Sequence, residues 1–377
     1  MNWELKKLNE VCLIGDGNHS SNYPKNSEMI NEGIPFVRAN NMKNGIVVWE
    51  NMKFISVSKH EKLKKGHLKA GDVLFTNRGE IGKVAILGED FKEANLNSQI
   101  AWFRTHDMLE TRFLFYYLIS PTLKSHFNNE KSGAALQQLT IRQINAIEIP
   151  IPSKDEQQKI IDNLDTTFEL IDRAKANIEK NIQNAKELFQ SKLNQVFSEN
   201  GEGWQEKRLE EVFRLRSGAG LTSKEMIPDG KYPVYGGNRI AGYFNEYNFE
   251  NGVIIGRVGA LCGNVRFINQ KIWITDNAFK LTDFKFDLDF KYLTYLLNWK
   301  NLRSYARQAA QPVISNSSLK DVLLNFPSSL DKQKEIVSKL DQLSAQTELL
   351  QQKYQQKLAN LEELKKSILE KAFKGEL

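Results

Sequence analysis

The sequence contains few cysteines and no long apolar stretch, and both absences narrow the class of protein. Its two cysteines, Cys12 and Cys262, lie far apart in a chain of 377 residues, so they predict neither a disulfide framework nor a CxxC metal pair. The sequence contains no run of about 18 apolar residues, which is the length needed to span a membrane. Its start, MNWELKKLNEV, lacks the apolar core of a signal peptide. We therefore expect a cytoplasmic protein with no membrane partner.

Catalytic signatures are missing as well. The sequence has no GxxxxGK[ST] phosphate loop, and the glycines of GRVGALCG at 256–263 do not form a GxGxxG pattern. The five histidines show no metal-ligand spacing. No (N/D)PP(Y/F) stretch, which amino-methyltransferases use to hold a target amine, occurs either. We expect a chain that recognises rather than reacts, with no metal and no cofactor of its own.

What the sequence does have is a duplicated plan. WELKKLNEV at 3–11 returns as WQEKRLEEV at 204–212, and IPSKDEQQKIIDNLD at 151–165 returns as FPSSLDKQKEIVSKLD at 326–341. A repeat of nearly half the chain length predicts two copies of one module.

The offset between the copies differs along the chain. It stays at 176 positions from 155 to 197, whereas before this stretch it drifts. This predicts two long helices of locked length, at 155–200 and 331–377, that follow two globular domains of variable length, at 1–154 and 201–330.

Each globular segment has the pattern of an α+β domain. Short β-branched runs, such as those at 73–75, 252–256 and 271–275, alternate with turns rich in Gly and Asn. A helix is predicted near 111–119 in the first copy and near 290–299 in the second. We expect two tandem, pseudo-twofold-related α+β domains.

The long segments predict an antiparallel coiled coil. Asp155 and Asp331 could serve as N-caps, and neither Pro nor Gly interrupts the run that follows each of them. At about 1.5 Å per residue, each helix would span roughly 64 Å. A simple dimerisation helix is the alternative, but the duplication favours a spacer between two related domains. Steps of seven give one apolar seam, and the remaining apolar residues are predicted to fill the neighbouring heptad position. The seam residues are Leu164, Ile171, Ile178, Ala185, Leu340, Thr347, Tyr354 and Leu361, and the neighbouring position holds Ile160, Ala174, Leu188, Ile336, Leu343, Leu350 and Leu364.

The charge balance favours a polyanionic partner. The formal net charge is +6 and the pI is about 9.0, with most of the positive surplus on the two globular segments. Phosphate backbones bind such surfaces through counterion release.

Together these motifs resemble the specificity subunit of type I restriction-modification enzymes. Each module opens with W-x-x-x-x-L-x-E-V, closes with (I/F)-P-x-x-x-x-x-Q-x-x-I and continues into a long helix, and the chain ends in LKKSILEKAFKGEL. GIPFVRANNM in the first domain and PVYGGNRIAGY in the second fit target-recognition domains. The resemblance covers nearly the whole chain.

The resemblance implies a division of labour among subunits. Two target-recognition domains would each read one half of a split sequence in double-stranded DNA. Two methyltransferase subunits would dock on the helices and methylate adenine N6 with S-adenosylmethionine. Two restriction subunits would cut unmodified DNA with ATP and magnesium.

Candidate DNA-binding residues follow from the chemistry of base recognition. Arg reads guanine and Asn or Gln reads adenine in the major groove, whereas Lys mostly positions phosphates. Arg38 could instead be a structural ion-pair partner, and Asn41 or Asn238 could stabilise turns. The candidates in polar turns are Asn18, His19, Ser20, Arg38, Asn40, Asn41, Arg78 and Lys83, followed by Arg216, Ser217, Lys224, Tyr235, Asn238, Arg239 and Arg257.

Two other functions fit the sequence. The chain could be a spare specificity subunit that exchanges recognition domains with a sister copy and is never assembled itself. It could also be a duplicated coiled-coil adaptor that binds no nucleic acid. Steep salt dependence of binding would distinguish a phosphate-binding protein from that adaptor.

Overall fold

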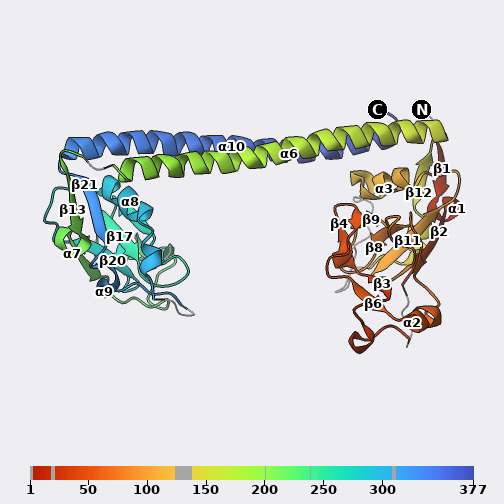
Figure 1. Ribbon diagram of the computed structural model, residues 1–377, viewed down its shortest axis with the longest axis horizontal. Coiled ribbons are helices and arrows are strands. Elements are labelled where there is room, and N and C mark those ends of the chain that lie inside the picture. The colour runs from red at the N-terminus through yellow and green to blue at the C-terminus, as the bar shows by residue number, and fades with distance from the viewer. Residues whose placement is uncertain (1–2, 18–21, 124–137, 200, 238, 308–310) are drawn as a thin grey trace. The chain divides into compact units, whose positions relative to one another are not determined.

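The computed structural model describes residues 3–17, 22–123, 138–199, 201–237, 239–307 and 311–377. The chain divides into two compact units, each of which combines a globular part with segments of two long helices. The first unit contains residues 1–178 and 356–377, and the second contains residues 179–355. The long helices are α6 (Lys154–Phe197) and α10 (Leu330–Lys374) (Figure 1).

The globular part of the first unit is an α+β domain with two sheets and a short ribbon. The larger sheet has the order β2-β11-β8-β9-β5-β4, the smaller has the order β6-β3-β10-β7, and β1 pairs with β12. Its elements are β1 (Glu4–Lys7), α1 (Leu8–Val11), β2 (Cys12–Asp16), η1 (Asn26–Glu28), β3 (Ile34–Val37), η2 (Ala39–Asn41), β4 (Met42–Lys43), β5 (Ile46–Val47), β6 (Lys53–Ile55), α2 (Val57–Lys62), β7 (His67–Leu68), β8 (Val73–Thr76), β9 (Val84–Ile86), β10 (Ala94–Leu96), β11 (Ile100–Thr105), α3 (Thr111–Ile119), α5 (Ile141–Asn145) and β12 (Glu148–Ile151).

The second unit repeats this plan with fewer strands. Its larger sheet has the order β14-β20-β17-β18, its smaller sheet has the order β16-β15-β19, and β13 pairs with β21. Its elements are β13 (Trp204–Arg208), α7 (Leu209–Val212), β14 (Arg214–Ser217), β15 (Tyr232–Tyr235), β16 (Ile240–Phe244), β17 (Gly252–Gly256), β18 (Val265–Ile268), β19 (Trp273–Ile274), β20 (Ala278–Thr282), α8 (Phe290–Trp299), η3 (Leu302–Tyr305), α9 (Asn316–Leu319) and β21 (Leu323–Pro327).

These elements confirm the predicted fold class. The helices expected at 111–119 and 290–299 are α3 and α8, and the strand expected at 252–256 is β17. The strand expected at 271–275 is shorter, because only Trp273 and Ile274 pair with β15.

The main core of each unit joins the larger sheet to the long helices. In the first unit, Phe103 of β11 and Phe113 of α3 share a core with Leu164 of α6 and Phe373 of α10. In the second unit, Phe279 of β20 and Leu293 of α8 share a core with Phe197 of α6 and Leu340 of α10. Burial of these large apolar side chains fixes each globular part on its helix segments.

The N-caps of the long helices differ from those predicted. The backbone amide of Glu156 donates to Ser153 Oγ over 3.4 Å, while its carboxylate accepts from the Ser153 amide over 3.1 Å. The amide of Lys332 likewise donates to Ser329 Oγ. The prediction of Asp155 and Asp331 as caps was therefore wrong, because a serine two residues earlier supplies the capping oxygen.

The predicted seam residues lie on the inner side of the helices, but part of the neighbouring heptad position was assigned wrongly. Leu188, Leu350 and Leu364 are 54%, 39% and 47% exposed. The inward residues of α6 alternate in steps of four and three, so Phe189 rather than Leu188 follows Ala185 in the seam. Leu164, Ile171, Ala185 and Leu340 are buried, and Ile178, Thr347, Tyr354 and Leu361 are half-buried.

A buried glutamine joins the globular part of the first unit to α6. Gln157 is fully buried, and its Oε1 accepts a hydrogen bond from the Glu110 amide over 2.8 Å. Its Nε2 donates to the carbonyl oxygens of Met108, over 2.9 Å, and Pro152, over 3.0 Å. We call this arrangement a glutamine clamp.

The second unit repeats the clamp at the position predicted by the sequence repeat. Gln333 is fully buried and accepts from the Asp289 amide over 2.8 Å. It donates to the carbonyl oxygens of Asp287, over 3.2 Å, and Pro327, over 2.9 Å. The glutamine that recurs at the constant offset of 176 positions is thus a structural residue in both copies.

A second joint accompanies each clamp. Asp165 of α6 accepts from the Tyr116 hydroxyl and from Arg112 on α3, and Asp341 of α10 accepts from Tyr295 and Lys291 on α8. Partial burial raises the pKa of Asp341, but the Lys291 and Tyr295 hydrogen bonds outweigh it, so the net pKa lies below the usual value. These polar contacts attach α3 to α6 and α8 to α10, beside the apolar cores that join the same helices.

His60 of α2 and His67 of β7 form a histidine pair in the first unit. His67 Nε2 donates to the Leu63 carbonyl oxygen over 2.6 Å, and His67 Nδ1 lies 3.0 Å from His60 Nε2. The remaining His60 nitrogen faces the Asn95 amide nitrogen. Burial first, and the neighbouring His67 second, lower the pKa of His60, whereas Glu93 and Glu61 act in the opposite direction.

We expect this pair to make the first unit sensitive to mild acid. Because the folded pKa of His60 is below its unfolded value, its contribution to stability is present above about pH 6.5 and is lost as the pH falls. Urea unfolding between about pH 7.5 and 5.5 should show this loss in the wild type and much less of it in His60→Gln. The exposed His106→Gln is the control, and an equal pH dependence in His60→Gln would contradict the assignment.

Candidate nucleic-acid interface

Polar loops of the first unit gather where several strands end. β2, β3, β8 and β10 end at Asp16, Val37, Thr76 and Leu96, and backbone hydrogen bonds tie the following residues together. The Asn97 amide donates to the Val37 carbonyl over 3.0 Å, and the Asn77 amide donates to the Gln99 carbonyl over 2.9 Å. The loops are therefore positioned by the sheets and not by their own contacts alone.

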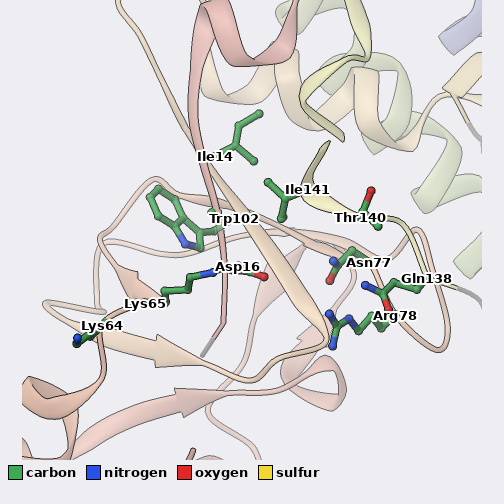
Figure 2. A pocket seen from close by; sticks show the side chains of 12 residues that line it. Ile14, Asp16, Lys64, Lys65, Asn77, Arg78, Trp102, Gln138, Thr140 and Ile141 are labelled. Carbon is green, nitrogen blue, oxygen red and sulfur yellow. Dashed lines mark hydrogen bonds and ion pairs between the residues drawn. The ribbon is translucent and has the colours of Figure 1, made fainter. Parts of the chain in front are cut away.

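A cavity of about 490 Å³ opens at this end of the first unit. Figure 2 shows Lys64, Lys65 and Arg78 around it, with the Trp102 indole as one wall. Asp16 accepts from Lys65 over 3.0 Å. Three cations and one carboxylate make the cavity suited to a negatively charged ligand.

The floor of the cavity is ordered by the segment that leads into α5. The Asn77 side-chain amide donates to the Leu139 carbonyl over 3.0 Å, and the Leu139 amide donates to the Asn77 carbonyl over 2.8 Å. With its amide oxygen turned toward Arg78, Gln138 accepts from the guanidinium over 3.0 and 3.2 Å. Arg78 is thus held in a fixed direction.

Trp102 was missed by sequence reasoning. Gly15 lies opposite it on β2, and a Cβ at Gly15 would lie 2.7 Å from the indole ring. The glycine makes room for the ring, but no local sequence signal links the two positions.

The predicted residues of the first unit lie in different surroundings. Arg78 lines the cavity, and Arg38 directly follows β3 and donates to the Asn51 carbonyl over 2.7 Å. Asn40 is exposed, and Lys83 is half-buried and pairs with Glu80 over 2.7 Å. Asn41 is fully buried, where it accepts from the Arg38 amide and donates to the Glu50 carbonyl. In this structure Asn41 stabilises a turn and is not open to a ligand. Asn18, His19 and Ser20 lie outside the described residues.

The second unit builds the same loop arrangement. The Arg257 amide donates to the Asn277 carbonyl over 3.0 Å, and the Ile314 amide donates to the Arg257 carbonyl over 2.8 Å. Arg257 therefore occupies the position of Asn77.

Two of the predicted residues of the second unit meet directly. Arg257 donates to Ser217 Oγ over 2.9 Å and to the Asp276 carbonyl over 3.2 Å, and its guanidinium stacks 4.7 Å from the centre of the Phe279 ring. Arg216, the residue before Ser217, forms an ion pair with Asp283 over 2.8 Å.

The other predicted residues of the second unit are spread over neighbouring loops. Tyr235 ends β15 and is half-buried, Arg239 lies exposed in the turn to β16, and Lys224 is exposed before β15. Asn238 lies outside the described residues. Exposed Arg and Lys side chains at strand ends can donate hydrogen bonds to DNA phosphates and base edges.

The described ranges contain no cluster of three His, Cys, Asp or Glu side chains that could hold a metal ion. None of the helices in those ranges combines the length and the apolar character needed to cross a membrane.

Both repeats match one protein family. The family model for the type I restriction modification DNA specificity domain matches residues 1–184 and 201–358. The chain belongs to this family of type I specificity subunits.

Characterised relatives agree over most of their length. The specificity subunit of the type I restriction enzyme EcoprrI from Escherichia coli is 25% identical over 359 residues, which cover 91% of this chain and 88% of the relative. The StySPI specificity subunit from Salmonella potsdam is 25% identical over 388 residues, with 91% and 82% covered.

Solved structures share the fold. A chain described under "complex assembly" and "conformational transition of the type I R-M system" matches with a TM-score of 0.82 and 22% identity, covering 100% of this chain and 98% of its own. The HsdS subunit from Thermoanaerobacter tengcongensis matches with a TM-score of 0.64 and 21% identity, covering 100% and 97%.

Proposed function

We propose that this specificity subunit reads a bipartite target in double-stranded DNA, one half with each globular domain. The observation that carries the proposal is the duplicated loop arrangement, in which the Asn77 and Arg257 backbones make equivalent hydrogen bonds at equivalent strand ends. Two copies of one reading surface on one chain suit a target in two parts. The positive surplus of the chain supports a phosphate-bearing ligand.

We further propose that catalysis resides in partner subunits. Two methyltransferase subunits would supply adenine N6 methylation with S-adenosylmethionine, and two restriction subunits would cut DNA with ATP and magnesium. The chain itself would be non-catalytic. Recognition by its domains has to accommodate a duplex in which the target adenine is moved out of the base stack.

Methylome sequencing tests the proposal most directly. A methylation-free host would carry this chain together with its neighbouring methyltransferase gene. The expected result is N6-methyladenine in both halves of one split motif, which disappears when this chain is omitted. No methylation despite an assembled complex would overturn the proposal and favour the spare-subunit or adaptor function.

Arg239→Ala is expected to weaken discrimination at one half-site and to leave assembly intact. Arg239 is exposed in the turn between β15 and β16, and Gly237 of this turn packs against the backbone of Gly256 and Val258, on either side of Arg257. Loss of a good bidentate base contact reduces discrimination by about 1–3 kcal/mol. Methylome sequencing of the variant measures this effect. Arg208→Ala, which removes an exposed arginine beside Asp321, is the control, and an unchanged motif in Arg239→Ala would contradict the prediction.

The exposed leucines of the long helices suggest where the methyltransferase subunits dock. Leu188 and Leu364 occupy equivalent positions of the repeat, and each stands one residue before a seam position. Asp165 and Asp341 stand one residue after seam positions and contact α3 and α8. The leucines therefore lie on the flank opposite to the one that carries the globular parts. One such leucine in each unit matches two copies of one partner.

Leu188→Glu and Leu364→Glu should each remove one methyltransferase subunit from the complex. A carboxylate on an apolar contact surface would be desolvated without a partner, which opposes docking. Native mass spectrometry should show one methyltransferase subunit on either single variant and none on the double variant. Gln352→Glu, at an exposed polar position of α10, is the control. A full set of subunits on the double variant would exclude this surface.

A further inference from the structure

The two units differ at one row of residues that crosses the larger sheet. Strand register in the first unit aligns Gly15, Trp102, Leu74 and Ala85 across β2, β11, β8 and β9. In the second unit the same register aligns Arg216, Lys280, Ile254 and Arg266 across β14, β20, β17 and β18. Three positions that are apolar or glycine in one copy are therefore cationic in the other.

The equivalence of the two rows is fixed by loop contacts next to them. Gly17 and Gly218, two residues after Gly15 and Arg216, both lie against the backbone carbonyl of the residue that follows a strand of the smaller sheet, Asn97 after β10 and Thr275 after β19. Asn77 and Arg257, which follow β8 and β17, make matching backbone hydrogen bonds. The cationic residues of the second unit therefore occupy the same structural positions as the glycine and apolar residues of the first unit.

The cationic row has little negative charge to balance it. Arg216 pairs with Asp283, and Arg214, two residues earlier on the same strand and therefore on the same face, is exposed. Lys280 and Arg266 are half-buried, and within the described residues neither has a carboxylate within ion-pair distance. The Arg266 guanidinium lies 5.8 Å from the centre of the Tyr235 ring.

A half-buried guanidinium without a carboxylate is unfavourable in the free protein. Burial lowers the pKa of Arg266 from its ordinary value, which reports the desolvation of the charged form. An arginine that stabilised the fold alone would be expected to have an anionic partner. The missing negative charge points to an anion that arrives with a ligand.

We propose that Arg216, Lys280 and Arg266 form a phosphate-binding ledge on the second globular domain, which holds the backbone of the DNA duplex. The inference rests on the proposed DNA-binding function. The ledge is present in the second globular domain and absent from the described residues of the first. The row crosses four strands about 4.8 Å apart and is about 14 Å long. Ile254, between Lys280 and Arg266, is buried in the core with Ile272 and Ile274, so Arg216 and Lys280 lie on one side of it and Arg266 lies on the other.

The ledge positions the DNA and does not read it. Its residues lie within strands, one residue before the strand end at Arg216, whereas Arg239 and Arg257 lie in loops beyond the strands. Phosphate contacts carry no sequence information, so the ledge sets the register of the second domain on any duplex. The first domain lacks these charges and instead presents the Trp102 cavity.

The test uses the complex assembled with its methyltransferase subunits. Fluorescence anisotropy would measure binding to two unmethylated duplexes, one with the motif that the complex methylates and one without it, from about 50 to 200 mM salt. The variants are Lys280→Gln, Arg266→Gln and the double variant. Lys280→Arg and Arg266→Lys keep the charge, and Lys320→Gln, beside Asp321, removes a charge elsewhere in the same unit.

Each lost charge should reduce the slope of log affinity against log salt by about 0.9 and weaken binding to both duplexes about fivefold at about 0.15 M salt. The methylated motif should stay the same, and the charge-preserving variants and Lys320→Gln should behave as the wild type. Unchanged slopes, or a loss confined to the motif-bearing duplex, would overturn the ledge. Loss of methyltransferase subunits with unchanged DNA affinity per complex would mean that the row binds an acidic protein surface instead. A wild-type complex whose DNA binding ignores salt would refute the proposed function itself.

Discussion

Gln157→Ala is expected to lower the free energy of unfolding of the first unit by roughly 3–5 kcal/mol, since buried polar groups left without a partner cost about 1–3 kcal/mol each. The truncation removes the partner of the Glu110 amide and of the carbonyl oxygens of Met108 and Pro152. It also leaves a cavity at a fully buried site. Urea unfolding of the wild type and the variant measures the change.

The neighbouring residue supplies a matched control. Gln158 is exposed and, within the described ranges, its side chain donates to Asp162, one turn along the same helix, so Gln158→Ala should change stability by less than about 0.5 kcal/mol. Gln333→Ala should destabilise the second unit as Gln157→Ala destabilises the first, because its three hydrogen bonds are equivalent. Equal stabilities of Gln157→Ala and Gln158→Ala would show that the clamp does not hold the unit together.

Gly256→Ala is expected to destabilise the second unit by about 3 kcal/mol and to displace the turn that carries Arg239, because inserting atoms into a packed site costs about 1–3 kcal/mol and occasionally more. A Cβ at Gly256 would lie 1.8 Å from the Gly237 carbonyl oxygen, so one of the two backbones must move. The equivalent position of the first unit is Thr76, which shows that the close approach belongs to the second unit. Thermal unfolding reports the stability, and methylome sequencing reports the loss of one half-site.

Gly220→Ala is the matched change for that experiment. A Cβ there would meet no atom within 4 Å, and the residue is exposed, so neither stability nor the motif should change. A Gly256→Ala variant as stable as Gly220→Ala would mean that the turn at Gly237 yields freely, which would contradict a rigid reading surface.

Sequence reasoning predicted the modules because their signals are local or repeat at a constant offset. Gln157 and Gln333 were visible as repeated letters, and α3, α8 and β17 followed from short apolar patterns. The heptad error at Leu188 arose because an apolar residue beside a seam looks the same in sequence as one within it. Only the packed helices separate the two.

The candidate site was less predictable because it depends on strand register. The repeat offset changes from strand to strand, so the correspondence of Trp102 with Lys280 is hidden until the sheets are aligned. Asn41 shows the same limit at a single residue. Its amide fits a base edge as well as it fits a turn, and only its burial identifies the turn.

The glutamine clamp has a consequence for how such a chain can change its specificity. Among the described residues of the globular part, each clamp bonds to main-chain amides and carbonyls, at Met108 and Glu110 in one unit and at Asp287 and Asp289 in the other. Main-chain atoms are the same whatever side chains the domain carries. A recombination event that exchanged one globular part for a divergent relative would therefore keep the joint with the helix intact, and a new DNA preference could be acquired in one step on an unaltered scaffold.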